Sequence, residues 1–329
     1  MSPDDALPPV EPPSASFLLQ LFIVPGIIVV AVVMVWMLFT WLAHKGDDPR
    51  QYVKALQRSS ANRWQVAVTL ASVMQDKRHG AFKRDPQAAA ELARLLDEEI
   101  AAGSMEENQV TLRVFLARTL GEFCIPDVLP VLLKAATTAR QPEEKHVRQA
   151  AIEAIAVLAQ NMSQEQPPQK LHDSALTETM LALSRDDDPA VRYRAAFALG
   201  LMGDDVFLDR LERMIEDVNP DVRYNAATGL SRYGNERAIV VLEEMLDPTQ
   251  SAGMNQEAEA ADRPAKQVNI LLNAMRATQQ LAARNPQADI APLRAAIEKL
   301  TKSKLPRPVV LEAEQTLIRL GTPAEAATN

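Results

Sequence analysis

Two stretches of the chain align without a gap at an offset of 31 residues, and this repeat limits the possible folds more than any other feature. The first stretch, DDPAVRYRAAFALGLMG, runs from Asp187 to Gly203, and the second, VNPDVRYNAATGLSRYG, runs from Val218 to Gly234. A fixed offset with matching apolar positions is typical of a solenoid, in which each unit packs on its neighbours. We therefore expect repeated units that stack in a row.

Five units contain an arginine that is followed by apolar or small residues three, four and seven positions later, and by a small residue at position eight. After Arg192 these are Ala195, Ala196, Leu199 and Gly200. This spacing marks one stripe of an α-helix, and the small residue allows a neighbouring helix to approach closely. Five arginines start this register: Arg63, Arg113, Arg148, Arg192 and Arg223. Weaker copies end at Leu281 and Leu320, with Ala274 and Ala313 in place of the arginine.

A second helix is predicted after most of these copies. The predicted ranges are 86–101, 127–138, 173–184, 206–217, 236–246 and 290–301. Asp188 and Asn219 precede prolines at 189 and 220, a pattern typical of a helix N-cap followed by proline in the first turn. Gly203 and Gly234 are expected to end their helices. The sequence therefore predicts about six to seven antiparallel helix pairs over residues 62–321.

Composition agrees with a helical fold and excludes some functions. Aromatic residues make up only 5% of the chain, whereas strands favour aromatic and β-branched residues. The formal charge of −8 argues against nucleic-acid binding, which requires a basic face. The single cysteine, Cys124, excludes an internal disulfide framework and is expected to be a small buried side chain.

Residues 17–43 form an uncharged run of 27 residues, FLLQLFIVPGIIVVAVVMVWMLFTWLA. About 20 helical residues cross the hydrocarbon core of a bilayer, so this run predicts a transmembrane helix. A cleaved signal peptide is the alternative, but it would have a basic N-terminal region. The first 16 residues instead contain three acids and no lysine or arginine. The fold class is therefore all-α, with one N-terminal transmembrane helix followed by an α-solenoid.

The residues that flank this run predict its orientation. The basic residues Lys45, Arg50, Lys54, Arg58 and Arg63 follow it, and positive residues stay on the cytoplasmic side of a membrane. We expect the N-terminus outside and the solenoid in the cytoplasm. The chain is predicted to begin with a disordered Pro-rich segment at 1–16, followed by the transmembrane helix at 17–43 and a juxtamembrane linker or first helix at 44–61. The solenoid is predicted at 62–321, and a disordered tail at 322–329 follows it. Within the solenoid, residues 247–265 are predicted to form a mobile loop.

The repeat resembles HEAT repeats, in the short form of the phycobilisome-lyase-like HEAT group, over about residues 50–321. This resemblance implies a helical solenoid that binds proteins, in which the second helix of each pair lines the concave surface. It also implies that the five arginines form a structural ladder with acids of adjacent repeats, here Asp188 and Asp221. An anionic-ligand groove is the alternative role for these arginines.

The sequence contains no clear catalytic, cofactor or metal site. The iron-dependent hydroxylase that is built on HEAT-like repeats uses His-Glu pairs, and none of the four histidines here is followed by glutamate. The histidines and Cys124 also lack the spacing of metal ligands, and no glycine-rich phosphate loop occurs.

A partner-binding face is predicted on the second helices. Adjacent aliphatic residues that we expect to be exposed, with acids beside them, suit a basic amphipathic segment. The residues of this face are Pro130, Val131, Val240, Val241, Glu243 and Glu244. The sequence therefore predicts a membrane-tethered scaffold or adaptor without enzymatic activity or cofactor. The alternatives are a chromophore lyase-like or auxiliary factor, as the resemblance implies, and an accessory subunit of a membrane complex.

Overall fold

The structure is a computed structural model in which residues 15–44, 48–58, 62–171, 173–250 and 263–321 are described. It divides into two compact units, Met1–Asp48 and Pro49–Asn329, and we call the second unit the repeat domain. The disorder predicted for the N-terminal segment and for residues 322–329 falls outside the described residues, apart from residues 15 and 16, which are helical. Most of the loop predicted to be mobile, residues 251–262, also falls outside them.

The first unit contains one long helix, α1 (Ala15–His44), which agrees with the predicted range 17–43. Its segment Leu21–Thr40 has a mean hydropathy of 2.9, and none of it is buried. At a rise of about 1.5 Å per residue, this segment is long enough to cross a bilayer. A signal sequence near an N-terminus has the same length and composition.

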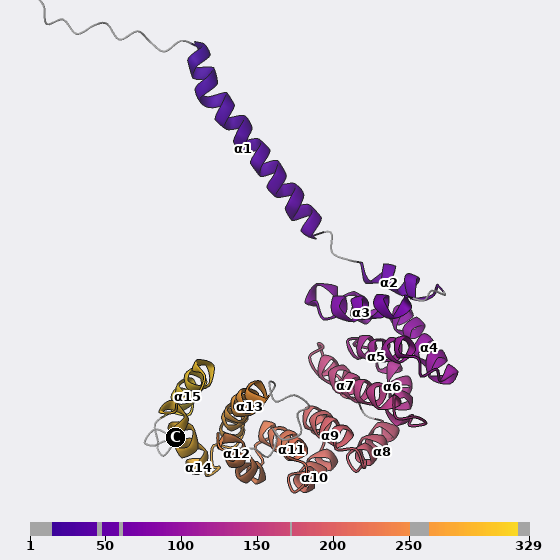
Figure 1. Cartoon of the computed structure of the whole chain (residues 1–329), viewed down its shortest axis with the longest axis vertical. Coiled ribbons are helices and arrows are strands. Elements are labelled where there is room, and N and C mark those ends of the chain that lie inside the picture. The colour runs from indigo at the N-terminus through magenta and orange to yellow at the C-terminus, as the bar shows by residue number, and fades with distance from the viewer. Residues whose placement is uncertain (1–14, 45–47, 59–61, 172, 251–262, 322–329) are drawn as a thin grey trace, which may run out of the picture. The chain divides into compact units, whose positions relative to one another are not determined.

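The repeat domain consists of helices in every element that the structure describes (Figure 1). It starts with α2 (Pro49–Leu56) and continues through six helix pairs to a last single helix. The first helices of the pairs, and the last helix, are α3 (Arg63–Met74), α5 (Glu107–Gly121), α7 (Glu144–Ser163), α9 (Pro189–Met202), α11 (Pro220–Arg232), α13 (Arg263–Arg284) and α15 (Arg307–Arg319). The second helices are α4 (Pro86–Ala102), α6 (Leu129–Thr137), α8 (Ser174–Leu183), α10 (Asp205–Met214), α12 (Ile239–Leu246) and α14 (Ala291–Thr301).

The predicted helix caps are confirmed at α9 and α11. The Asp188 carboxylate accepts a hydrogen bond from the backbone amide of Ala190 at 2.8 Å. The Asn219 side-chain oxygen accepts from the amides of Asp221 and Val222 at 2.9 and 3.2 Å. These bonds satisfy amides that have no partner within the helix. At the other end of α9, Gly203 has a φ of 69°, a conformation that favours glycine.

The small residue at the eighth position allows close packing of the first helices, as predicted. A Cβ atom added to Gly200 of α9 would lie 2.6 Å from the Cα of Gly229 in α11. A Cβ added to Gly121 of α5 would lie 2.6 Å from the Cα of Ala154 in α7. Real Cβ atoms do not approach a backbone atom this closely, so only glycine fits at both positions.

The first helices lie on the inner side of the curved row that the repeat domain forms, and the second helices lie on its outer side (Figure 1). The expectation that the second helices line the concave surface is therefore wrong. The glycine and alanine contacts explain the difference, because they bring the first helices closer together than the larger Leu and Met side chains bring the second helices. The more closely spaced layer lies inside the curve.

Candidate functional site

The five arginines of the repeat register lie on first helices and reach toward the ends of second helices. Arg192 of α9 shows this geometry most fully. Its Nη1 donates to the backbone carbonyls of Asp186 and Asp187 at 2.9 and 3.0 Å. Its Nε and Nη2 donate to the two carboxylate oxygens of Asp217 at 2.8 and 2.9 Å. Arg192 therefore joins the segment before α9 to the segment after α10.

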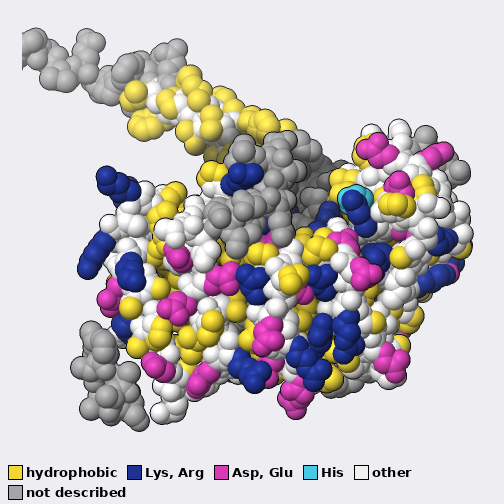
Figure 2. Space-filling model, turned by 60° about the horizontal axis from the view of Figure 1, so that its bottom comes forward, with side chains coloured by type: hydrophobic (Ala, Val, Ile, Leu, Met, Phe, Trp, Pro, Cys, Tyr) yellow, Lys and Arg dark blue, Asp and Glu magenta, His cyan; other side chains and the backbone are white. Residues whose placement is uncertain are grey.

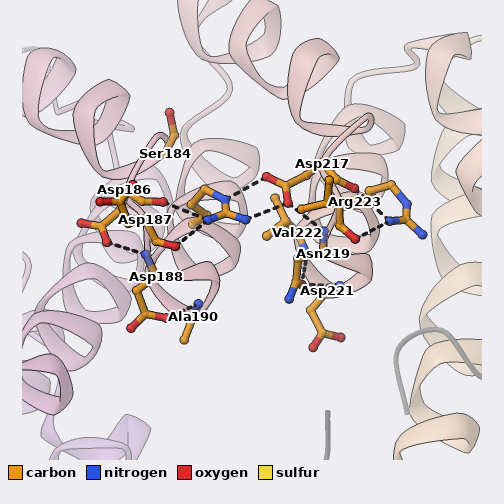
Figure 3. A network of polar contacts seen from close by, with 12 residues as sticks. Ser184, Asp186, Asp187, Asp188, Ala190, Asp217, Asn219, Asp221, Val222 and Arg223 are labelled. Carbon is orange, nitrogen blue, oxygen red and sulfur yellow. Dashed lines mark hydrogen bonds and ion pairs between the residues drawn. The ribbon is translucent and has the colours of Figure 1, made fainter. Parts of the chain in front are cut away.

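Arg223 of α11 repeats this arrangement one unit later (Figure 3). Its Nη1 donates to the backbone carbonyl of Asp217 at 2.9 Å, and its Nη2 donates to the Glu244 carboxylate at 2.6 Å. The Tyr224 hydroxyl also donates to Glu244, at 3.0 Å. Asp217 thus accepts from one arginine through its carboxylate and from the next through its carbonyl.

Arg148 of α7 extends the network in the other direction. Its Nε donates to the carbonyl of Ala136 at 3.1 Å, and its Nη2 pairs with the Asp186 carboxylate. Asp186 therefore also serves two arginines, Arg148 through its carboxylate and Arg192 through its carbonyl. We call the resulting continuous network the arginine ladder, which comprises Arg148, Asp186, Arg192, Asp217, Arg223 and Glu244.

The two remaining arginines have similar contacts that do not join this network. Arg63 donates to the carbonyl of Leu56 at 2.9 Å and pairs with Glu99 at 3.0 Å. Arg113 faces Glu144 at 3.5 Å, and both side chains are only 1% exposed. Each of the five arginines thus contacts an acid. The arginines recur at the same position of their repeats because the repeats pack in the same way.

The ladder changes the protonation behaviour of Asp217. Burial alone would raise the pKa of this carboxyl, but the hydrogen bonds from Arg192 and from the amide of Asn219 outweigh burial and lower the pKa. The same Asp217 bonds raise the pKa of Arg192. Both groups are therefore charged at neutral pH, as an ion pair requires.

Asp188 and Asp221 are not the acids of the ladder, so this part of the prediction is wrong. Asp188 caps α9, and Asp221 pairs with Lys266 at 2.9 Å. Asp188 is the N-cap of α9, so a helix amide already holds its carboxylate, and Asp221 lies in the first turn of α11. The signal that sequence reasoning missed is an acid at the end of the following second helix, as at Glu99, Asp217 and Glu244.

The predicted partner face is only partly exposed. The side chain of Val240 is 75% exposed, whereas Val241 is only 5% exposed. On α6, Pro130 is exposed and Val131 is buried. The prediction that Val131 and Val241 face solvent is therefore wrong, because a second helix in the stack is covered by neighbours on more than one side.

A groove between α12 and α14 remains at this face, and we call it the outer groove. It encloses about 560 Å³. Its lining combines apolar side chains with acidic and basic ones: Val240, Leu246, Leu300, Glu243, Asp247 and Lys299. Glu243 is exposed, while Glu244 is half-buried and held by Arg223 in the ladder. The exposed part of the predicted face is thus Val240 with Glu243.

Figure 2 shows the side of the repeat domain to which the second helices contribute. Basic, acidic and apolar side chains are interspersed over it, although several Lys and Arg side chains gather in one part. Among the described residues, no group of three or more His, Cys, Asp or Glu side chains is placed to hold a metal ion. Burial raises the pKa of the half-buried Cys124 thiol to about 11, so this thiol is protonated at neutral pH.

Two family models match the centre of the repeat domain. A model described as HEAT repeats matches residues 176–261, and a model described as HEAT-like repeat matches residues 145–202. The chain is a HEAT-repeat protein. The match includes α9 and α11, from which the 31-residue offset was read. Among curated proteins, no sequence matches this HEAT-repeat chain.

Several solved structures are similar to this HEAT-repeat protein over most of its length. YibA of E. coli is 18% identical, with a TM-score of 0.34, over 84% of this chain and 94% of that one. Human deoxyhypusine hydroxylase is 17% identical, with a TM-score of 0.32, over 83% of this chain and 84% of that one. An engineered protein is 16% identical, with a TM-score of 0.36, over 85% of this chain and 80% of that one.

Proposed function

We propose that this HEAT-repeat protein is a membrane-tethered, non-enzymatic scaffold whose outer groove binds a basic, amphipathic helix of a partner protein. The observation that carries the proposal is the exposed Val240 beside Glu243 in a groove of about 560 Å³. An exposed apolar side chain in a groove with acids at its rim suits a helix that has one apolar and one basic face. HEAT repeats commonly mediate protein interactions.

The tether in this proposal is α1, and its orientation follows from the basic residues that come after it. Lys45, Arg50, Lys54 and Arg58 follow α1, and positive residues stay on the cytoplasmic side of a membrane, which supports a cytoplasmic repeat domain. A reporter that is active only outside the cytoplasm should stay silent when it is fused after Asn329. Activity of that reporter would contradict the orientation and leave the scaffold proposal untouched.

Site-specific crosslinking in native membranes tests the binding proposal. A photoreactive amino acid at position 240 should form one discrete adduct with a partner protein, because this position lies in the outer groove. The same amino acid at Ile318, a side chain that is 79% exposed on α15, serves as the matched control and should form none. Val240→Glu should abolish the adduct formed from a second probe at Glu243. Equal adducts at both positions, or none at position 240, would contradict the proposal.

A further inference from the structure

The inner side of the repeat domain carries a second groove, between α11 and α13, which we call the inner groove. It encloses about 520 Å³. Between α9 and α11 the two helix backbones come into contact at Gly200 and Gly229, whereas α11 and α13 leave this space between them. Both α11 and α13 belong to the inner layer of helices in Figure 1. The groove therefore opens where close packing of the first helices is interrupted.

The helices on the two sides of the inner groove run in the same direction. Lys266 near the start of α13 pairs with Asp221 near the start of α11, at 2.9 Å. Just past the other end, the Asn285 amide donates to the carbonyl of Gly234 at 3.1 Å. The groove is therefore a channel between two parallel helices, and a bound chain can lie along both of them.

Uncharged hydrogen-bonding side chains line both walls of this channel. Asn269 and Asn273 line the α13 wall, and Asn225 and Thr228 line the α11 wall. Asn269 and Asn273 are exposed, and neither side chain forms a hydrogen bond with the part of the chain that the structure describes. Asn225 uses its amide nitrogen to donate to the carbonyl of Tyr193 at 3.2 Å, which leaves its side-chain oxygen as an acceptor.

The charged residues of the inner groove neutralise each other. Asp221 and Lys266 both line it, and they form the ion pair that joins the starts of α11 and α13. A ligand therefore meets amide and hydroxyl groups rather than an unbalanced charge. This chemistry distinguishes the inner groove from the outer groove, where acids and a lysine surround an exposed valine.

The spacing of the amides matches an extended polypeptide. Asn269 and Asn273 are one helical turn apart, so their side chains repeat about every 6 Å along the groove. An extended chain presents equivalent peptide groups to the same side every two residues, or about every 6.6–6.8 Å. Each asparagine amide carries both a donor and an acceptor, which one peptide unit satisfies. From Ala265 to Asn273 the wall extends about 12 Å, which accommodates about four extended residues.

We propose that the inner groove binds a short, uncharged, extended segment of a partner protein through its main chain, with Asn269 and Asn273 on one wall and Asn225 and Thr228 on the other. The inference rests on the proposed scaffold function, because it assigns this domain a second recognition surface. The two grooves differ in the class of segment that they bind. The inner groove binds an uncharged extended segment, whereas the outer groove binds a basic helix.

Selection of random peptides displayed on phage tests this inference, with the full-length protein in lipid nanodiscs as the target and empty nanodiscs as the subtraction step. The expected result is enrichment of peptides without charged residues at their centre. The double variant Asn269→Leu/Asn273→Leu should weaken their binding about tenfold or more, as expected for the loss of two hydrogen bonds. Gln287→Leu adds the same side chain at an exposed position after α13 and should leave binding unchanged.

Thr228→Val provides an independent variant on the opposite wall, because it removes the hydroxyl without changing the size of the side chain. It should also weaken binding, and circular dichroism and melting show whether each variant is folded. Absence of enrichment, or unchanged binding to both the double variant and Thr228→Val, would overturn the inference. Peptides that lose binding to Val240→Glu but keep binding to the inner-groove variants bind the outer groove. That result would also overturn the inference about the inner groove, and it would leave the proposed scaffold function standing.

Discussion

Arg192 makes four hydrogen bonds to the segments before α9 and after α10, so this one side chain connects two consecutive repeats. Its guanidinium offers five donors in a fixed plane, which suits simultaneous contact with a carboxylate and two carbonyls. A lysine would supply the charge without this geometry. At the scale of single residues, the ladder therefore depends on arginine and not on positive charge alone.

Arg192→Ala should lower the free energy of unfolding by about 1–3 kcal/mol, because it leaves Asp217 and two carbonyls without their donor. Urea unfolding followed by circular dichroism measures the change. Arg213→Ala is the matched control, since Arg213 is an exposed arginine on α10, and its effect should stay within about 0.5 kcal/mol. Equal losses in the two variants would show that the ladder contributes no particular stability.

The pKa of Asp217 predicts how stability depends on pH. Because folding lowers this pKa below the usual value of 3.8, the contribution of the ionised carboxylate is present above about pH 4 and is lost as the pH falls through the folded-state value. Unfolding free energies of the native protein and of Asp217→Asn, measured from pH 7 down to about pH 3, should therefore converge below about pH 4. A constant difference over this range would contradict the prediction.

At the scale of helices, the close contact of α9 with α11 limits the side chains that fit between them. Gly200→Ala places a Cβ within 2.6 Å of the backbone of Gly229, which cannot give way as a flexible side chain does. The variant should lose about 1–3 kcal/mol of stability in thermal or urea unfolding. Gly80→Ala is the control, because Gly80 has ordinary helical angles and no atom closer than 3.5 Å to the added Cβ. This control should be neutral or slightly stabilising, and a similar loss in both variants would argue against a packing effect.

The helices themselves were predictable from the sequence, because their signals are local. The cap at Asp188 and the stripe from Ala195 to Gly200 both lie within one helix. The pairing of Arg192 with Asp217 spans 25 residues and depends on how two helices are oriented, so local pattern could not select it over Asp188. The burial of Val241 could not be predicted for a related reason. The apolar stripe predicted for this helix accounts for contact with one neighbour, whereas α12 contacts α11, α13 and α14.

At the scale of the whole molecule, the boundary between the two units follows Asp48. A truncated chain that begins at Asp47 should be soluble and helical without detergent, because it lacks the apolar segment Leu21–Thr40 and retains the buried core of the repeats. Ultracentrifugation and circular dichroism check this result. A requirement for detergent would reveal a second membrane contact within the repeat domain.

The arginine ladder spans α7 to α12 and has no equivalent at α13 and α15, where Ala274 and Ala313 replace the arginine. In a linear array, cooperativity depends on the coupling between nearest neighbours. Because Asp186 and Asp217 each serve two arginines, opening one repeat within this span leaves charged groups of the next repeat without partners. We therefore expect amide hydrogens from α7 to α12 to exchange with solvent together and slowly, as one cooperative block. Those of α14 and α15 should exchange earlier, through fraying from the end of the array.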